Sequence, residues 1–141
     1  MAAMFIKSLQ LKQVVLLIYG CFLIALSVFK TSEILLPYIY QFEALLGGDK
    51  LMHLKLSAVL SILALFALIP NSKQGMRLLA HALGICFLLV TGLMLDELHQ
   101  ALISTRRFEW LDFVYGVSGI SMGLVAYLTF VLLRLTQKRF I

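Results

Sequence analysis

Four long apolar segments, separated by short charged stretches, constrain this chain more than any other feature. They cover residues 14–29, 51–70, 78–95 and 113–133. An α-helix needs about 20 mostly apolar residues to cross the hydrocarbon core of a bilayer, so each segment predicts a transmembrane helix. The first segment is slightly short, and an extension back to Leu11 or forward through residues 34–36 makes up the difference.

The composition excludes an ordinary soluble domain. Hydrophobic residues make up 62% of the 141 residues and charged residues 13%, whereas soluble domains are near half apolar and a quarter charged. The net charge of +5 does not indicate a nucleic-acid partner, because the charges fall between apolar segments, where they report topology. Cys21 and Cys86 each lie within an apolar segment, which favours buried, inert thiols over a disulfide.

The distribution of basic residues predicts the orientation of the chain. The basic start followed by an apolar run resembles a signal peptide, but no small-x-small cleavage site precedes Lys30, so the first helix is expected to be retained. Four spans place both termini on one side. That side holds Lys7, Lys12, Lys73, Arg77, Arg134, Lys138 and Arg139, and the other holds Lys30, Lys50, Lys55, Arg106 and Arg107 with every acidic residue.

Because Lys and Arg resist export and acidic residues matter little, we predict that the termini are cytoplasmic. The expected fold is an all-α integral membrane protein, a bundle of four transmembrane helices that forms a single domain over residues 1–141. The longest connection, residues 30–48, contains Pro37, which limits any continuous helix there. It ends at two glycines, after which Asp49 is predicted to N-cap the second span.

Two polar clusters then lie on the extracytoplasmic face. Asp49, Lys50 and His53 open the second span at spacings that place them on one helical side. As a purely structural set, Asp49 caps the helix, Lys50 extends its charge to the interface and His53 sits there. As a functional set, the three form part of a binding site.

The second cluster ends the third span with Asp96, Glu97, His99 and Gln100. Glu97 and Gln100 share one face, and Asp96 and His99 share another. Carboxylates at a helix C-terminus oppose the helix dipole, so they require partners.

Arg106 and Arg107 are the expected partners, since a guanidinium binds a carboxylate in a bidentate way. A structural staple from Arg106 to Glu97 or Asp112 is the alternative to a functional site. Asp112 is predicted to N-cap the fourth span. His81 lies near the opposite face and is expected to stay outside the site.

Glycines mark a helix contact in the fourth span. Gly119-x-x-x-Gly123 is a small-x-x-x-small pattern for close helix packing in lipid. Gly116 lies close to the same stripe. Ala80-x-x-x-Gly84 on the third span is the expected counterpart.

The polar residues favour an anionic ligand over a metal ion. His53, His99, Glu97, Asp49 and Asp112 supply enough metal ligands, but no tight signature such as H-E-x-x-H is present, so neither a metal nor another cofactor is expected. Lys50, Arg106 and Arg107 suit a phosphate, a carboxylate or an anionic headgroup. If a reaction occurs, Glu97 with His53 or His99 is the expected acid/base pair.

These residues resemble the VanZ-like family of small bacterial membrane proteins over residues 49–123. The family shows Asp-Lys-x-x-His opening one helix, which Asp49-Lys50-Leu51-Met52-His53 matches. Its Glu-x-x-Gln element matches Glu97-Leu98-His99-Gln100, and its Arg six residues before an Asp matches Arg106 and Asp112. Glycines follow at the spacing of Gly119 and Gly123. The family commonly has Asn where this chain has Gly116.

The resemblance implies a multi-pass protein of the bacterial cytoplasmic membrane that acts in the cell envelope, with a link to glycopeptide antibiotic susceptibility. The first hypothesis is a protein that binds or modifies a membrane lipid, a lipid-linked sugar or a cell-wall component. The second is a non-catalytic scaffold or accessory subunit whose polar residues staple helix ends together. A transporter is disfavoured because transport sites lie near the bilayer midplane. Homo-oligomerisation and catalysis both stay open.

Overall fold

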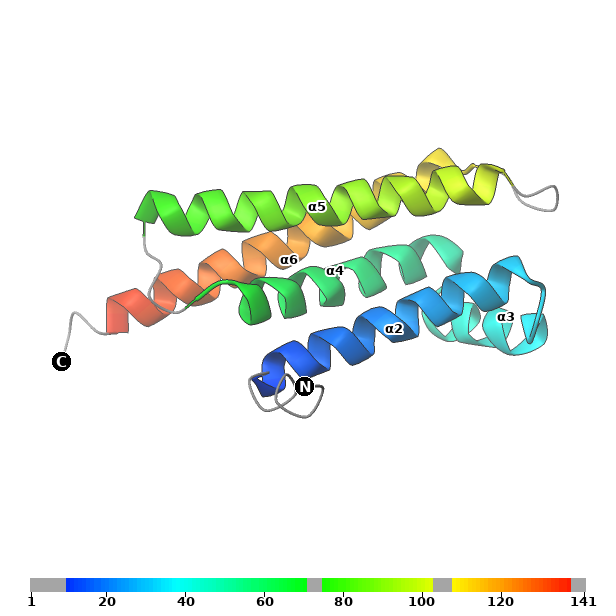
Figure 1. Cartoon of the computed structure of the whole chain (residues 1–141), viewed down its shortest axis with the longest axis horizontal. Coiled ribbons are helices and arrows are strands. Elements are labelled where there is room, and N and C mark those ends of the chain that lie inside the picture. Colours follow the sequence, from blue (N-terminus) through cyan, green and yellow to red (C-terminus); the bar gives the residue numbers. More distant parts are fainter. Residues whose placement is uncertain (1–9, 71–74, 103–107, 138–141) are drawn as a thin grey trace, which may run out of the picture.

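The computed structural model describes residues 10–70, 75–102 and 108–137. These ranges form five α-helices and contain no β-strand. The helices are α2 (Leu11–Thr31), α3 (Leu36–Leu45), α4 (Asp49–Leu68), α5 (Gly75–Ala101) and α6 (Trp110–Gln137). All but α3 are long and apolar enough to cross a membrane by length and composition, so the four predicted long apolar helices are confirmed. The long helices run alongside one another in an elongated bundle (Figure 1).

The predicted connection between the first two spans contains a helix, α3. The break between α2 and α3 lies at residues 32–35, and Pro37 follows it, in the first turn of α3. There its missing N–H is not needed and its fixed φ suits the helix. The reversal before α3 uses left-handed backbone at Glu33 and Leu35, with φ of 59° and 61°. α3 packs beside the ends of α2 and α4 (Figure 1).

Neither Asp49 nor Asp112 is the N-cap residue that the sequence predicted, because each lies inside the first turn of its helix. Gly48, with φ of 101°, is the N-cap of α4, and Asp49 lies in the first turn. α6 begins at Trp110, so Asp112 also lies inside the first turn, where its N–H donates to the Glu109 carbonyl at 3.0 Å. Each carboxylate binds a lysine, as described below, in place of capping its own helix.

The closest helix pair is α4 with α6, and glycines make the approach possible. A Cβ at Gly119 would overlap the carbonyl oxygen of Leu54, and one at Gly123 would overlap the side chain of Ser61. Small residues therefore meet small residues across this interface, an arrangement typical of close helix pairs in lipid.

The predicted counterpart on α5 is wrong. Ala80 and Gly84 are both exposed, and no described atom lies within 4 Å of a Cβ built on Gly84. α4 carries its own small residues at Ala58 and Ser61, which Gly119 and Gly123 of α6 meet. Gly116 instead faces Leu93 of α5.

The two cysteines differ in environment. Cys86 is buried in an apolar cluster with Leu65, Ala82 and Tyr127, and both thiols are free. Cys21 is exposed, contrary to the prediction. In the part of the chain that the structure describes, no residue of α2 is buried, because this helix packs along one side only and presents the remainder of its surface outward.

We predict that Gly119→Ala destabilises the protein, because the added methyl group must push α6 away from the backbone of α4. Overpacking of this kind costs about 1–3 kcal/mol. Thermal unfolding of the detergent-solubilised protein measures it. Gly84→Ala is the matched control, since its methyl group meets open space. Equal melting of the two variants would contradict the packing role of Gly119.

Candidate functional site

The ends of α2 and α5 lie near α3 and the starts of α4 and α6 at one end of the bundle (Figure 1). Polar side chains from these helices contact one another there. The alternation of helix direction produces this convergence, because the first and third connections between the long helices, from α2 to α4 and from α5 to α6, fall at this end. The two polar clusters that the sequence places apart are thus brought together in space. Their contacts fall into three groups.

The first group is centred on Lys30 at the end of α2. Its Nζ lies 2.5 Å from Oε1 of Glu43 on α3 and 2.6 Å from Oδ1 of Asp49 on α4. Glu43 is buried, on the same face of α3 as Ile39. One ammonium group therefore ties three helices together and is shared by two carboxylates.

The second group is centred on Lys50 in the first turn of α4. Its ammonium donates to Oδ1 of Asp112 at 2.6 Å and also to Glu109. The side chain of Asp112 is 4% exposed, whereas that of Glu109 is 54% exposed. The buried charge of Asp112 thus has a direct counter-ion, and α6 is fixed to α4 at its first turn.

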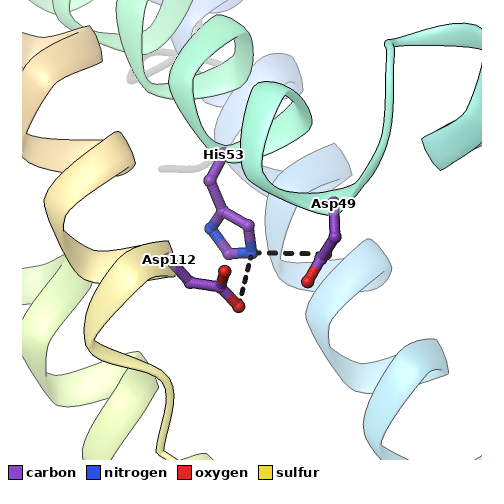
Figure 2. A group of neighbouring side chains, drawn as sticks. All are labelled: Asp49, His53 and Asp112. Atoms are coloured by element: carbon purple, nitrogen blue, oxygen red, sulfur yellow. Dashed lines mark ion pairs between the residues drawn. The ribbon is translucent and has the colours of Figure 1, made fainter.

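His53 lies between these two groups. Its Nε2 is 3.7 Å from Oδ1 of Asp49, one turn earlier on α4, and 3.8 Å from Oδ2 of Asp112 on α6. Figure 2 shows the ring with both carboxylates facing the same nitrogen. These atoms could supply three ligands for a metal ion, since they all lie within 4.8 Å of one another.

The third group joins α2 to α5 through Asp96. Ser27 donates to Oδ1 of Asp96 at 2.8 Å, and Nε2 of Gln100 donates to Oδ2 at 2.8 Å. The carboxylate that opposes the helix dipole of α5 is therefore satisfied by a serine and an amide. The sequence predicts that Asp96 and His99 lie on the same helical face. The residue of α5 that hydrogen-bonds to Asp96 is Gln100, one turn after Asp96.

The remaining predicted site residues differ in environment. Glu97 is 1% exposed and Gln100 is 3% exposed. His99 is exposed and takes no part in the three groups. Arg106 and Arg107, and with them the predicted staple to Glu97 or Asp112, lie outside the residues that the structure describes. For Asp112 the observed cationic partner is Lys50. His81 is exposed and bonds through Nδ1 to the Arg77 carbonyl on its own helix, away from the site.

A cavity of about 540 Å³ extends from the polar end into the bundle. It lies between α2, α4 and α5. Its polar lining comes mainly from the helix ends: Ser27, Lys30, His53, Asp96 and Gln100. Most of the remaining wall is aliphatic and continues along the same helices: Leu26, Leu56, Leu60, Leu89 and Leu93. The cavity therefore has a charged end and an apolar body.

Sequence reasoning missed Ser27, Lys30 and Glu43 as site residues. A lysine that closes an apolar span ordinarily extends to the interface, so Lys30 carried no distinctive signal. Ser27, one turn earlier, shares its face, and this spacing is the one feature that marks the pair. Glu43 was not predicted because residues 30–48 were interpreted as a connection, whereas Glu43 lies on a helix, α3.

Comparison with known proteins adds no relative. No protein-family model matches the chain, no curated protein matches it, and no solved structure matches it.

We predict that Lys50→Met destabilises the protein by about 1–3 kcal/mol, because it leaves the buried carboxylate of Asp112 without its charged donor. Thermal unfolding in detergent measures the change. The double variant Lys50→Met with Asp112→Asn is expected to recover part of the loss, since the uncompensated charge is then gone. Lys55→Met is the matched control, because Lys55 is exposed and donates only to the Leu46 carbonyl among the described contacts. A Lys50→Met variant that melts like Lys55→Met would show that the pair contributes nothing.

Proposed function

We propose that this chain is a VanZ-like multi-pass protein of the bacterial cytoplasmic membrane that binds an amphiphilic envelope molecule at its polar end. The class of ligand is a membrane lipid, a lipid-linked sugar or a cell-wall precursor. The order and spacing of the motifs from Asp49 to Gly123 support the family assignment.

The cavity is the observation that carries this proposal. It presents charged and hydrogen-bonding groups at the helix ends and an aliphatic wall further in, which matches a molecule with a polar head and a hydrocarbon tail. Its volume of about 540 Å³ lies within the roughly 300–1,000 Å³ of typical ligand pockets. Lys30 donates to two carboxylates, and because an ammonium has three donors, one N–H can serve an oxygen of the head group.

Charge supports the extracytoplasmic placement of this end. Every acidic residue of the chain belongs to it, and the opposite ends of the helices carry Lys12, Arg77 and Arg134. The positive-inside rule then places that opposite end, and both termini, in the cytoplasm. The polar end faces the envelope, where the family resemblance also points.

For chemistry on the bound molecule, His53 is the acid/base group with the best position. Its ring lines the cavity, and its Nε2 lies 3.7 Å from an oxygen of Asp49 and 3.8 Å from an oxygen of Asp112. Glu97 and His99 stay predictions as acid/base groups, Glu97 buried on α5 and His99 exposed. Binding does not depend on this step.

A scaffold or accessory subunit is the second candidate, and a specific observation favours it. The shared lysines Lys30 and Lys50 do tie α2, α3, α4 and α6 together. This reading assigns the polar residues to stability alone and leaves the cavity without a role.

A variant whose side chain fills the cavity distinguishes amphiphile binding from a scaffold role. We predict that Gly92→Phe removes the bound amphiphile, because Gly92 lines the cavity and a side chain there meets no described atom within 4 Å at its Cβ. Gly84→Phe is the matched control, on the same helix but exposed and outside the cavity. Native mass spectrometry of protein purified in mild detergent measures the retained lipid. The expected result is a lipid or lipid-linked glycan on wild type and Gly84→Phe, at least tenfold depleted on Gly92→Phe.

Retention of no amphiphile by wild type, or equal retention by both variants, would count against binding in the cavity. Mass profiling of envelope lipids and glycans in cells with wild type, His53→Gln, Glu97→Gln or no protein then tests catalysis. A species that changes with wild type and not with one of the two variants indicates an enzyme, and its mass difference identifies the substrate class. No change at equal protein abundance indicates binding alone.

A further inference from the structure

The side chains of Asp49, His53 and Asp112 lie close enough to one another to hold one ion. Nε2 of His53 lies 3.7 Å and 3.8 Å from one oxygen each of Asp49 and Asp112, too far for direct hydrogen bonds. Two ligands held about 2.1 Å from a tetrahedral ion stand about 3.4 Å apart. The observed separations exceed this by a few tenths of an ångström, which a small side-chain rotation removes.

The charge around the triad also favours a cation. Lys30 is shared by Glu43 and Asp49, and Lys50 is shared by Glu109 and Asp112. Each of these units therefore keeps a net negative charge. His53 lies between the units and contacts one carboxylate from each, so an ion at its Nε2 would meet attraction from both sides.

The lysines hold the carboxylates without blocking the triad. Lys50 binds Oδ1 of Asp112, and the other oxygen, Oδ2, faces His53. Such outer partners orient metal ligands in known sites. At Asp49 the oxygen near His53 is the one that Lys30 binds, but a carboxylate has two oxygens, so it can hold the lysine with one and an ion with the other.

The chemical types of the ligands limit which ions can bind. Carboxylates suit Mn²⁺ and imidazole suits Zn²⁺, and a mixed set with three protein ligands leaves a position open for water or a substrate atom. The Asp112 carboxylate is 4% exposed and the His53 ring is 15% exposed, so the triad is shielded. His53 also lines the cavity, which places the triad beside the cavity's polar end.

We propose that Asp49, His53 and Asp112 form a site for one divalent transition-metal ion, Mn²⁺ or Zn²⁺. The sequence carries no compact metal signature because the ligands come from the first two turns of α4 and the first turn of α6, which are remote in the chain. The proposal does not depend on amphiphile binding in the apolar body of the cavity, which other residues enclose. It replaces the acid/base role of His53, because a ring nitrogen that holds a metal ion has no lone pair left for a proton.

The test is metal binding by the full-length protein in detergent, stripped with EDTA and titrated separately with Zn²⁺ and Mn²⁺ by calorimetry. We expect one ion per chain for wild type and at least tenfold weaker binding for His53→Gln and Asp112→Asn. His81→Gln and His99→Gln are the controls and are expected to match wild type, because neither residue belongs to the triad. The Gly92→Phe variant is expected to lose the amphiphile and keep the ion.

His53→Gln keeps both lysine-centred units, so it tests the ligand without removing a salt bridge of Lys30 or Lys50. Melting of each variant without metal checks that it is folded. Pulsed electron paramagnetic resonance of bound Mn²⁺ supplies a second readout, a nitrogen coupling from the imidazole that His53→Gln abolishes. Absence of one-to-one binding with either ion would overturn the proposal, as would affinity or nitrogen coupling that survives in His53→Gln.

Discussion

The close contact of α4 with α6 is the constraint on which the polar end depends. Gly119 and Gly123 let the backbone of α6 lie against Leu54, Ala58 and Ser61 of α4. Between helices in lipid there is little hydrophobic driving force, so such packing and interhelical polar contacts supply the attraction. The contact also fixes where α6 begins relative to α4. Asp112 thereby comes within reach of both Lys50 and His53, which lie in the first turns of α4.

Charged side chains are tolerated at this end because each lysine binds two carboxylates and several of these groups are partly exposed to solvent. A carboxylate as buried as Asp112 would be costly alone, and Lys50 offsets that cost while its own side chain stays 31% exposed. Lys30 does the same for Glu43 and Asp49 from another direction. The result is a polar layer that ties together the ends of helices whose lipid-facing surfaces have little to bind them. A stabilising role and a binding role therefore belong to the same residues, which explains why the sequence supports both.

The sequence predicted the features that depend on hydropathy and chain direction. The four spans follow from apolar length, and the meeting of Asp49, Lys50 and His53 with Asp112 follows from the alternation of the spans. The sequence did not show which of several possible residues each site residue contacts. Asp112 has both Lys50 and Arg106 on its side of the chain, and only distances distinguish them. The partner of Gly119 was likewise predicted on the wrong helix, because small residues occur on both α4 and α5 and a spacing does not say which helix is the neighbour.

The position of the cavity relative to the helix ends bears on how a ligand would reach it. Its polar lining, at Lys30, His53 and Asp96, belongs to the last turns of α2 and α5 and the first turns of α4, whereas its aliphatic wall lies deeper. In a membrane the former is at headgroup depth and the latter at hydrocarbon depth. An amphiphile from the same leaflet would already have its head and tail at these depths. It would therefore enter sideways, without moving a charged head through hydrocarbon. Since α2 contributes no buried residue and packs more extensively on α4 than on α5, we expect entry between α2 and α5, where the ligand would have to pass the Ser27–Asp96 hydrogen bond.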